Sequence, residues 1–366
     1  MKEFKPSSLV SNCKPYQISE SGKLKITDKK LYSKLDWNEA CYPPSNIVKK
    51  RLIEAVEDGF LNYYPDTSAS ELRSKLSHYV GVDDTFIQVF NGSDAALQTI
   101  CFAFLNNNDN ALVRDPTYTQ IYPFLNNTGA RVICFVGQTP FTKSIDKYHD
   151  YLSKNKIKMV YIANPNNPTG ILYEKALVKE LLERYPETFF IIDEAYFEYA
   201  KLTVVDLVRD FNNLAVTRTF SKAFGLAGLR LGYVISQPKT IENLNKIYNR
   251  KDVNILAQIA ASAALDDIPY MESQVNELIK TKTWLINELK KLNIEIHDTH
   301  GNFILIKVQN TNLIIEELKK EKILVRDRSS LPQMDGYIRI TVGLLSQMGQ
   351  FVKAISRIVY LAENRE

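Results

Sequence analysis

The sequence of 366 residues lacks several features that would place a protein in a class at once. It has no run of eighteen or more apolar residues, and its first seventeen residues contain no signal-peptide-like apolar stretch, so we expect a cytosolic protein. The four cysteines show no CxxC spacing, which argues against disulfides and structural zinc. The net charge of +4 is spread along the chain without a basic block, so neither a nucleic acid nor a membrane is an expected partner.

Metal binding is not indicated either. The chain has four histidines, and only His297 and His300 are close neighbours, in the loop-like stretch HDTHG. Such a pair is more typical of a solvated turn than of a metal site. A nicotinamide dehydrogenase is also disfavoured, because Gly225, Gly228 and Gly232 do not form GxGxxG and precede an apolar run instead of following one.

The sequence does contain short apolar runs that alternate with longer amphipathic stretches between about residues 60 and 236. Near-continuous apolar character predicts strands that are buried on both faces, and the amphipathic stretches predict crossover helices. The expected fold class is therefore α/β, with a mostly parallel central sheet and helices on both of its faces. The runs lie at 87–90, 111–115, 159–164, 189–193, 214–220 and 231–236.

The pattern changes after about residue 285, which indicates a second domain of the α+β type. We expect residues 37–250 to form a large domain and residues 251–366 a small C-terminal domain. Residues 1–36 show weak periodicity and are expected to form an arm that packs against the small domain and the active site. In the C-terminal part, strands are expected at 293–297, 302–308, 323–327 and 337–341, and helices at 313–321 and about 347–363.

Polar residues follow several of the predicted strands, where ligands bind in open parallel α/β sheets. Residues 91–94 (NGSD) lie between a strand and a helical pattern, which is suited to an anion, although a capped helix would look the same. In NPNNPTG (164–170), two Asn-Pro steps predict a turn-rich path that leaves the amides of Asn164 and Asn167 free at a strand end. A simple loop is the alternative for this segment.

Asp193 ends the strongly apolar strand 189–193. Burying a carboxylate there is costly unless a cation faces it, and a pyridinium nitrogen would be such a cation. Tyr196, three residues further on, can offer its hydroxyl group to a ring oxygen. Taken alone, the segment would be interpreted as a helix N-cap.

Lys222 follows the strand 214–220 and lies close to the hydroxyl groups of Thr219 and Ser221 and to Arg230. Most lysines are solvated surface groups. A lysine that forms a Schiff base needs desolvation and a nearby cation to lower its pKa, and hydroxyl and guanidinium donors to hold the cofactor phosphate. The surroundings of Lys222 therefore favour a lysine that anchors pyridoxal 5'-phosphate.

Taken in order, these segments resemble those of fold-type-I pyridoxal-phosphate aminotransferases, and more narrowly those of the histidinol-phosphate aminotransferase family. The combination of SKAFGLAGLR, RDRS and RITVG is specific to this branch, whereas NPNNPTG alone indicates only the wider class. The matching stretches are NEACYPPS (38–45), LNYYPD (61–66), NGSDAAL (91–97), NPNNPTG (164–170), DEAY (193–196), SKAFGLAGLRLG (221–232), LVRDRSSL (324–331) and IRITVG (338–343).

The resemblance implies a role for each matching residue in the cofactor site. Lys222 would carry the cofactor and move the proton, Asp193 would keep the pyridine nitrogen protonated, and Asn167 and Tyr196 would bond the ring oxygen. Tyr118 would stack on the ring. Around the phosphate, the resemblance implies Gly92, Ser93, Asp94, Thr219, Ser221, Arg230 and, from the neighbouring subunit of a homodimer, Tyr64.

For the substrate, the resemblance implies that Arg339 binds the carboxylate of glutamate or 2-oxoglutarate and that Arg326 binds the phosphate of the other substrate. A solvated charged turn is the alternative for Arg326. Tyr16 would cover the substrate from the arm, and Asn38 would line the same pocket.

The sequence departs from the family around the substrate mouth, at Ala40-Cys41, Pro43, Ala95 and residues 18–35. We expect amino transfer between glutamate and a phosphorylated amino compound, most like histidinol phosphate and part of amino-acid biosynthesis. A smaller substrate of the dihydroxyacetone phosphate or serinol phosphate type, used for a cell-surface polymer, is one alternative. A decarboxylase of a phosphorylated hydroxy-amino acid is another. A transcription regulator is disfavoured, because only about 36 residues precede the first motif.

Overall fold

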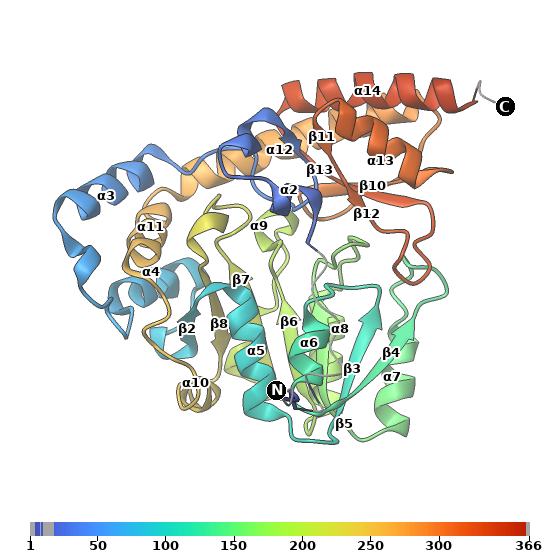
Figure 1. Cartoon of the computed structure of the whole chain (residues 1–366). Coiled ribbons are helices and arrows are strands. Elements are labelled where there is room, and N and C mark those ends of the chain that lie inside the picture. The colour runs from blue at the N-terminus through green and yellow to red at the C-terminus, as the bar shows by residue number, and fades with distance from the viewer. Residues whose placement is uncertain (1–3, 8, 10–17, 364–366) are drawn as a thin grey trace.

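The computed structural model describes residues 4–7, 9 and 18–363 (Figure 1). Tyr16 lies outside these residues. The central sheet has the strand order β2-β8-β7-β6-β5-β3-β4, and only β8 runs antiparallel to its neighbours. Its strands are β2 (Ile87–Phe90), β3 (Asn110–Asp115), β4 (Arg131–Val136), β5 (Ile157–Ala163), β6 (Phe189–Asp193), β7 (Leu214–Thr219) and β8 (Gly232–Ser236).

The predicted mostly parallel sheet is confirmed. Every residue of β6, β7 and β8 is buried, as near-continuous apolar strands require when helices cover both faces of a sheet. In Figure 1, α5 (Gly92–Phe104) and α6 (Ile121–Asn126) lie in front of the sheet. The other helices of this part are α3 (Asn46–Glu57), α4 (Ser70–Val80), α7 (Ile145–Lys154), α8 (Lys175–Arg184), α9 (Phe197–Ala200), α10 (Pro238–Leu244) and α11 (Ile255–Leu265).

The C-terminal part forms a separate small domain above the sheet in Figure 1. Its antiparallel sheet has the order β12-β13-β10-β9. The elements are α12 (Ile268–Lys290), β9 (Glu295–His297), β10 (Phe303–Lys307), α13 (Thr311–Lys320), β11 (Ile323–Leu324), β12 (Arg326–Asp327), β13 (Tyr337–Thr341) and α14 (Leu345–Glu363). The expected domain boundaries near residues 36 and 250 stay a prediction.

The segment before the large domain is joined to the small domain by backbone pairing. It contains α2 (Glu20–Lys23), the 3₁₀ helix η1 (Asp28–Leu31) and β1 (Ser33–Lys34). Strand β1 pairs in parallel with β11, and Leu35 N donates to Leu324 O at 2.7 Å. This pairing holds the segment against the strand that leads to Arg326.

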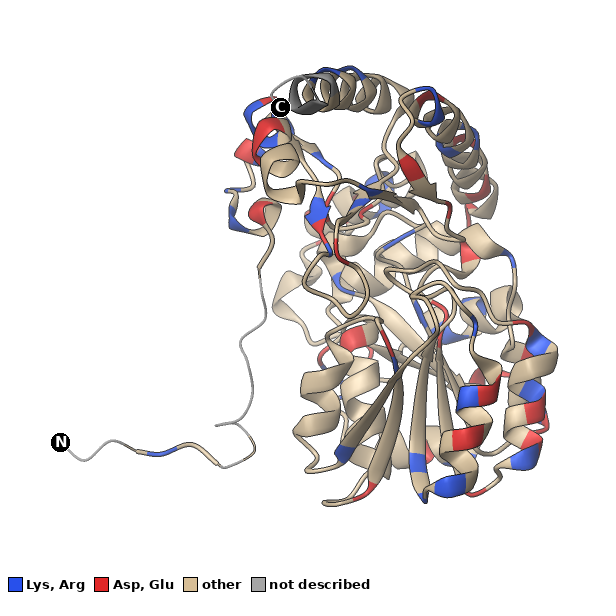
Figure 2. Cartoon of the chain, turned by 90° about the vertical axis from the view of Figure 1, so that its right-hand side faces the viewer, with Lys and Arg blue, Asp and Glu red and all other residues tan. Residues whose placement is uncertain are grey.

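Basic and acidic residues are interspersed along the outer helices in the view of Figure 2. Within the described part of the chain, none of the helices is both long enough and apolar enough to cross a bilayer.

Candidate active site

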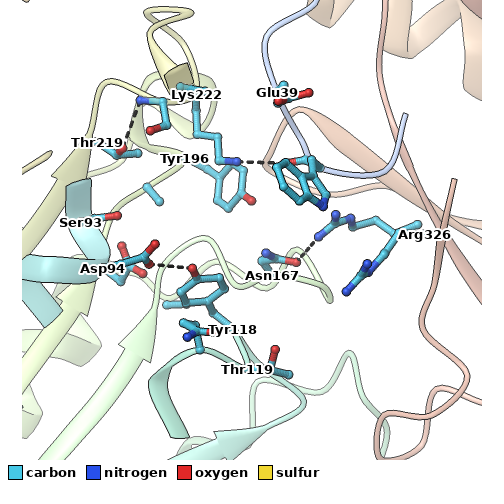
Figure 3. Close-up of a pocket in the computed structure, with 18 of the residues that line it drawn as sticks. Glu39, Ser93, Asp94, Tyr118, Thr119, Asn167, Tyr196, Thr219, Lys222 and Arg326 are labelled. Atoms are coloured by element: carbon cyan, nitrogen blue, oxygen red, sulfur yellow. Dashed lines mark hydrogen bonds between the residues drawn. The ribbon is translucent and has the colours of Figure 1, made fainter. Parts of the chain in front are cut away.

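A pocket of about 630 Å³ lies between the carboxyl ends of the central strands and the small sheet (Figure 3). In Figure 3, Lys222, Thr219, Ser93 and Asp94 lie on one side and Arg326 on the other. The predicted residues that line this pocket are Ser93, Asp94, Tyr118, Asn167, Asp193, Tyr196, Thr219, Ser221, Lys222, Arg230, Arg326 and Arg339.

Asp193 is buried at the end of β6, where the register places it opposite Thr217 of β7. The Thr217 hydroxyl donates to Asp193 Oδ1 at 3.0 Å, and the Tyr161 hydroxyl of β5 donates to Oδ2 at 2.8 Å. Burial raises the pKa of Asp193 to about 6, although both hydroxyl groups act to lower it. The carboxylate is therefore held in one orientation in a site that favours a facing cation.

Lys222 follows β7 and points into the pocket, where its Nζ atom donates to the carbonyl oxygen of Trp37 at 3.1 Å. The Nζ atom also lies 5.9 Å from the centroid of the Tyr196 ring. Burial, together with the nearby guanidinium of Arg339, lowers the pKa of Lys222 to about 8. A neutral amine at this position is a nucleophile at mildly alkaline pH.

An anion cradle forms where β2 leads into α5. The side chain of Arg230 packs so closely on Gly92 that an added Cβ would lie 2.8 Å from Nη2, and φ at this glycine is +83°. Arg230 Nη2 lies 3.2 Å from Asp94 Oδ2, and the Tyr118 hydroxyl donates to Asp94 Oδ1 at 2.7 Å. The absence of a side chain at Gly92 therefore allows the guanidinium of Arg230 to lie against the start of α5.

Ser221 contributes a buried hydroxyl group to the same cradle. Within the described part of the chain, its Oγ atom has no hydrogen-bond partner. A buried polar atom of this kind requires a ligand or water as its partner. A phosphate at the N-terminus of α5 would satisfy this hydroxyl group, so these residues fit the phosphate of pyridoxal 5'-phosphate.

Asn38 and Arg339 tie the large domain to the small sheet. Asn38 Nδ2 donates to the Tyr196 hydroxyl at 2.9 Å, and Thr341 Oγ1 donates to Asn38 Oδ1 at 3.0 Å. Arg339, which is buried on β13, donates from Nη1 to Asn167 Oδ1 at 2.7 Å. The predicted substrate residues thus contact the predicted ring-binding residues.

The expectation that the amide of Asn164 is free was wrong. Asn164 is fully buried, and its side chain holds the backbone of Tyr173 through Tyr173 N to Oδ1 at 2.7 Å and Nδ2 to Tyr173 O at 3.0 Å. His297, interpreted as part of a solvated turn, instead stacks on Phe141 with the ring centroids 3.6 Å apart. The side chains of Asn164 and His297 therefore make structural contacts and do not line the pocket described above.

Arg326 lies on β12 directly opposite Arg339 of β13. Like charges at directly opposite positions destabilise an antiparallel pair, and an anion bound in the pocket would offset that repulsion. Arg328 and Lys29 line the same pocket. Sequence reasoning missed both. The i, i+2 spacing of Arg326 and Arg328 was the available signal for Arg328.

Tyr64 does not line the pocket of its own chain. Its side chain is 80% exposed, and Lys251 Nζ lies 5.3 Å from the centroid of its ring. It follows η2 (Phe60–Asn62), which comes after α3. Tyr64 is therefore not placed to contact a cofactor bound in the pocket of its own chain.

A buried ion pair lies on the side of β6 and β7 opposite to Asp193. The Glu194 carboxylate accepts from Arg218 Nε at 2.9 Å, from the Thr203 hydroxyl at 2.8 and 2.9 Å and from Val204 N at 2.8 Å. The side chains of Glu194 and Arg218 are 0% and 2% exposed, and Arg218 stacks 3.7 Å from the centroid of the Phe197 ring. The pair joins the ends of two strands that carry pocket residues.

The fold and the pocket define a fold-type-I transferase. The profile of the family Aminotransferase class I and II matches residues 32–355, and the chain belongs to this family. Its resemblance to histidinol-phosphate aminotransferases is confirmed by relatives that cover most of its length. The chain is therefore an aminotransferase.

Two relatives and two solved structures illustrate this similarity. A dihydroxyacetone phosphate transaminase from Campylobacter jejuni is 38% identical over 327 residues, covering 88% of this chain and 89% of the relative. A histidinol-phosphate aminotransferase from Thermoanaerobacter pseudethanolicus is 34% identical over 310 residues, covering 84% and 88%. In fold, the chain is similar to histidinol-phosphate aminotransferase from Sinorhizobium meliloti in complex with pyridoxal-5'-phosphate (TM-score 0.88, 21% identity, 99% of both chains). It is also similar to L-threonine-O-3-phosphate decarboxylase from Porphyromonas gingivalis (TM-score 0.79, 23% identity, 90% of this chain and 99% of that chain).

Proposed function

We propose that the chain is a pyridoxal-phosphate-dependent aminotransferase that exchanges an amino group between glutamate and a small phosphorylated compound. One observation carries the proposal: a lysine of lowered pKa lies in one pocket with a buried strand-end carboxylate, an anion cradle and a cluster of arginines. Bound in this pocket, the cofactor would supply a carbonyl group that takes up the amino group and a ring that accepts the electron pair of the substrate Cα–H bond.

The residues around Lys222 and Asp193 fit that chemistry. Lys222 Nζ is the group we propose to bond the cofactor covalently and then, once displaced by the substrate amine, to carry the proton from the substrate α-carbon. Asp193 would keep a proton on the ring nitrogen, supported by its burial and by two hydroxyl donors that fix its oxygens. Gly92, Ser221 and Arg230 would hold the phosphate.

Arg339 and Arg326 support the substrate assignment. A guanidinium group forms two parallel hydrogen bonds with a carboxylate or a phosphate, so Arg339 would bind the glutamate carboxylate and Arg326 the phosphate. We place a dihydroxyacetone phosphate type of acceptor first, because the relative of that name is 38% identical and because the sequence departs from histidinol-phosphate aminotransferases at the pocket mouth. Histidinol phosphate is the second candidate, supported by relatives at 33 to 34% identity.

We further propose a homodimer in which the partner subunit's Tyr64 reaches the cofactor phosphate. Large exposed apolar side chains gather within residues 47–64, on α3 and η2, and α3 projects from the body at the left of Figure 1. Exposed apolar clusters of this size mark protein–protein interfaces. The side chains are Ile47, Ile53, Val56, Phe60, Leu61, Tyr63 and Tyr64.

The covalent role of Lys222 is tested by borohydride reduction of the enzyme purified with pyridoxal 5'-phosphate, followed by peptide mapping. We expect the reduced cofactor on the peptide that contains Lys222, and we expect Lys222→Ala to lose both the yellow absorbance and the activity. Lys239→Ala is the matched control, because Lys239 is an exposed lysine outside the pocket. A Lys222→Ala enzyme that remains yellow and active would refute the proposal.

The reaction is tested by incubating the wild type with glutamate and either dihydroxyacetone phosphate or imidazole acetol phosphate. We expect formation of 2-oxoglutarate that depends on the phosphorylated acceptor. Release of CO₂ from a phosphorylated hydroxy-amino acid, without any need for an acceptor, would instead identify a decarboxylase.

A further inference from the structure

We propose that Lys29 and Arg328 complete, with Arg326, a three-cation subsite that binds a phosphate monoester as its dianion. The proposal rests on the proposed function, because it concerns the phosphorylated substrate of the same pocket. It adds two phosphate-binding residues, one of which comes from the segment 18–35 that departs from the family sequence.

Arg326 lies on the edge strand β12, and Arg328 is the first residue after it, with its N–H still donating to Tyr337 O at 2.9 Å. Residues two apart on a strand point to the same side, and the burial of this segment follows that period. Arg326 and Arg328 are half-buried and line the pocket, whereas Asp327 between them is exposed and does not. The acidic residue of RDR therefore points away, and its charge is not directed into the subsite.

Lys29 reaches the same pocket from the N-terminal segment. It lies on η1, is half-buried, and its Nζ atom is 6.0 Å from the centroid of the Trp37 ring, which also lines the pocket. Among the described residues of 18–35, Lys29 alone lines this pocket. Lys30, the next residue on the same 3₁₀ helix, is exposed and does not line it.

Backbone pairing connects the two segments that carry these three cations. Lys34 pairs with Leu324 in the β1–β11 ladder, two residues before Arg326. The turn that carries Lys29 is thereby attached to the strand that carries the arginines. Main-chain hydrogen bonds thus link the two segments from which these cations reach the pocket.

The charge balance at this end of the pocket favours a doubly charged ligand. Arg339 lies opposite Arg326, and Lys29 and Arg328 add positive charge to the same part of the pocket. Two carboxylates, Asp36 and Glu39, also line this part of the pocket, and Glu39 is paired with Lys34. Lys29, Arg326, Arg328 and Arg339 still outnumber them. A phosphate monoester has a second pKa of about 6 and is mainly dianionic at pH 7, so it can neutralise two of these cations. A carboxylate carries one charge and neutralises one.

The test measures KM and kcat of the cofactor-loaded enzyme separately for the phosphorylated acceptor and for glutamate. We expect Lys29→Met and Arg328→Met each to raise KM for dihydroxyacetone phosphate on the order of tenfold, as for one lost charge-assisted contact. KM for glutamate should change by about twofold or less, since glutamate has no dianionic group. Inorganic phosphate should inhibit the wild type competitively with the acceptor and inhibit both variants more weakly.

Lys30→Met is the matched control, and Lys29→Arg is the charge-retaining variant. Both are expected to keep the wild-type KM for the phosphorylated acceptor. Lys29→Met and Arg328→Met enzymes whose KM and phosphate inhibition equal those of Lys30→Met would overturn the subsite while leaving the aminotransferase proposal intact. A wild type that uses no phosphorylated acceptor would overturn the proposed substrate and the subsite together. Equal rises of KM for glutamate and acceptor would also overturn the subsite, because they indicate a general loss of pocket structure.

Discussion

Breaking the ion pair between Glu194 and Arg218 is expected to lower the free energy of unfolding strongly. The loss should differ according to which of the two side chains is replaced. Removing one member of a buried pair leaves an uncompensated charge and costs about 3 to 5 kcal/mol. Glu194→Gln keeps the shape of the side chain and leaves Arg218 beside Glu198, so we expect a cost of about 3 kcal/mol. Arg218→Met leaves Glu194 and Glu198 without their cation, and we expect about 5 kcal/mol.

The double variant Glu194→Gln/Arg218→Met removes both charges at once. Replacing a whole buried pair by neutral groups is far less costly than breaking it, so we expect the double variant to be at least about 2 kcal/mol more stable than the sum of the single losses predicts. The free energy of unfolding would be measured by urea denaturation, followed by circular dichroism, at a fixed concentration of pyridoxal 5'-phosphate.

The exposed pair Lys239–Glu242 provides the control for this cycle. Its atoms are 2.8 Å apart, but the side chains are 74% and 57% exposed, so Lys239→Met should cost less than about 1 kcal/mol. The reasoning would fail if the buried single variants cost no more than this control. It would also fail if the double variant lost the full sum of the single values.

Two further predictions follow from the pocket and from its supporting loop. The rate at which the cofactor-free enzyme reacts with pyridoxal 5'-phosphate should rise with pH through about 8, because Lys222 reacts as the free amine. Arg339→Met should move that midpoint upward by removing a cation that lowers this pKa, and a wild-type midpoint near that of free lysine would contradict the assignment. Gly170→Ala should destabilise the protein by more than about 2 kcal/mol, because φ is +71° and the new Cβ would lie 2.3 Å from Thr299 Cβ. Gly228→Ala, where no atom lies within 4 Å, should leave the urea midpoint unchanged.

Most of the fold could be predicted from the sequence, because buried parallel strands appear as apolar runs and each predicted run is a strand. Strand β4, at the sheet edge, was missed although residues 132–136 form an apolar run; most of these residues are only partly buried. The expected strand 323–327 is split in two at Val325. Its first half pairs with β1 and its second half with β13, which no local pattern specifies.

In the candidate site, too, some residues follow from the local sequence and others depend on how the strands pair. The placement of Lys222, Asp193 and Ser93 in one pocket could be predicted because each lies at a strand end or three residues beyond one, and such ends meet at one edge of a parallel sheet. Tyr161 and Thr217 were missed because their bonds to Asp193 depend on the register of three strands.

The pairing of β1 with β11 has a mechanical consequence. Because residues 33–34 are hydrogen-bonded to the small domain, a rotation of that domain carries the N-terminal turn with it. In such a rotation, Lys29 and Arg326 would move together relative to Lys222. If the proposed subsite binds the phosphate, a molecule that lacks the phosphate would have less binding energy with which to hold the N-terminal turn and the small domain in one position.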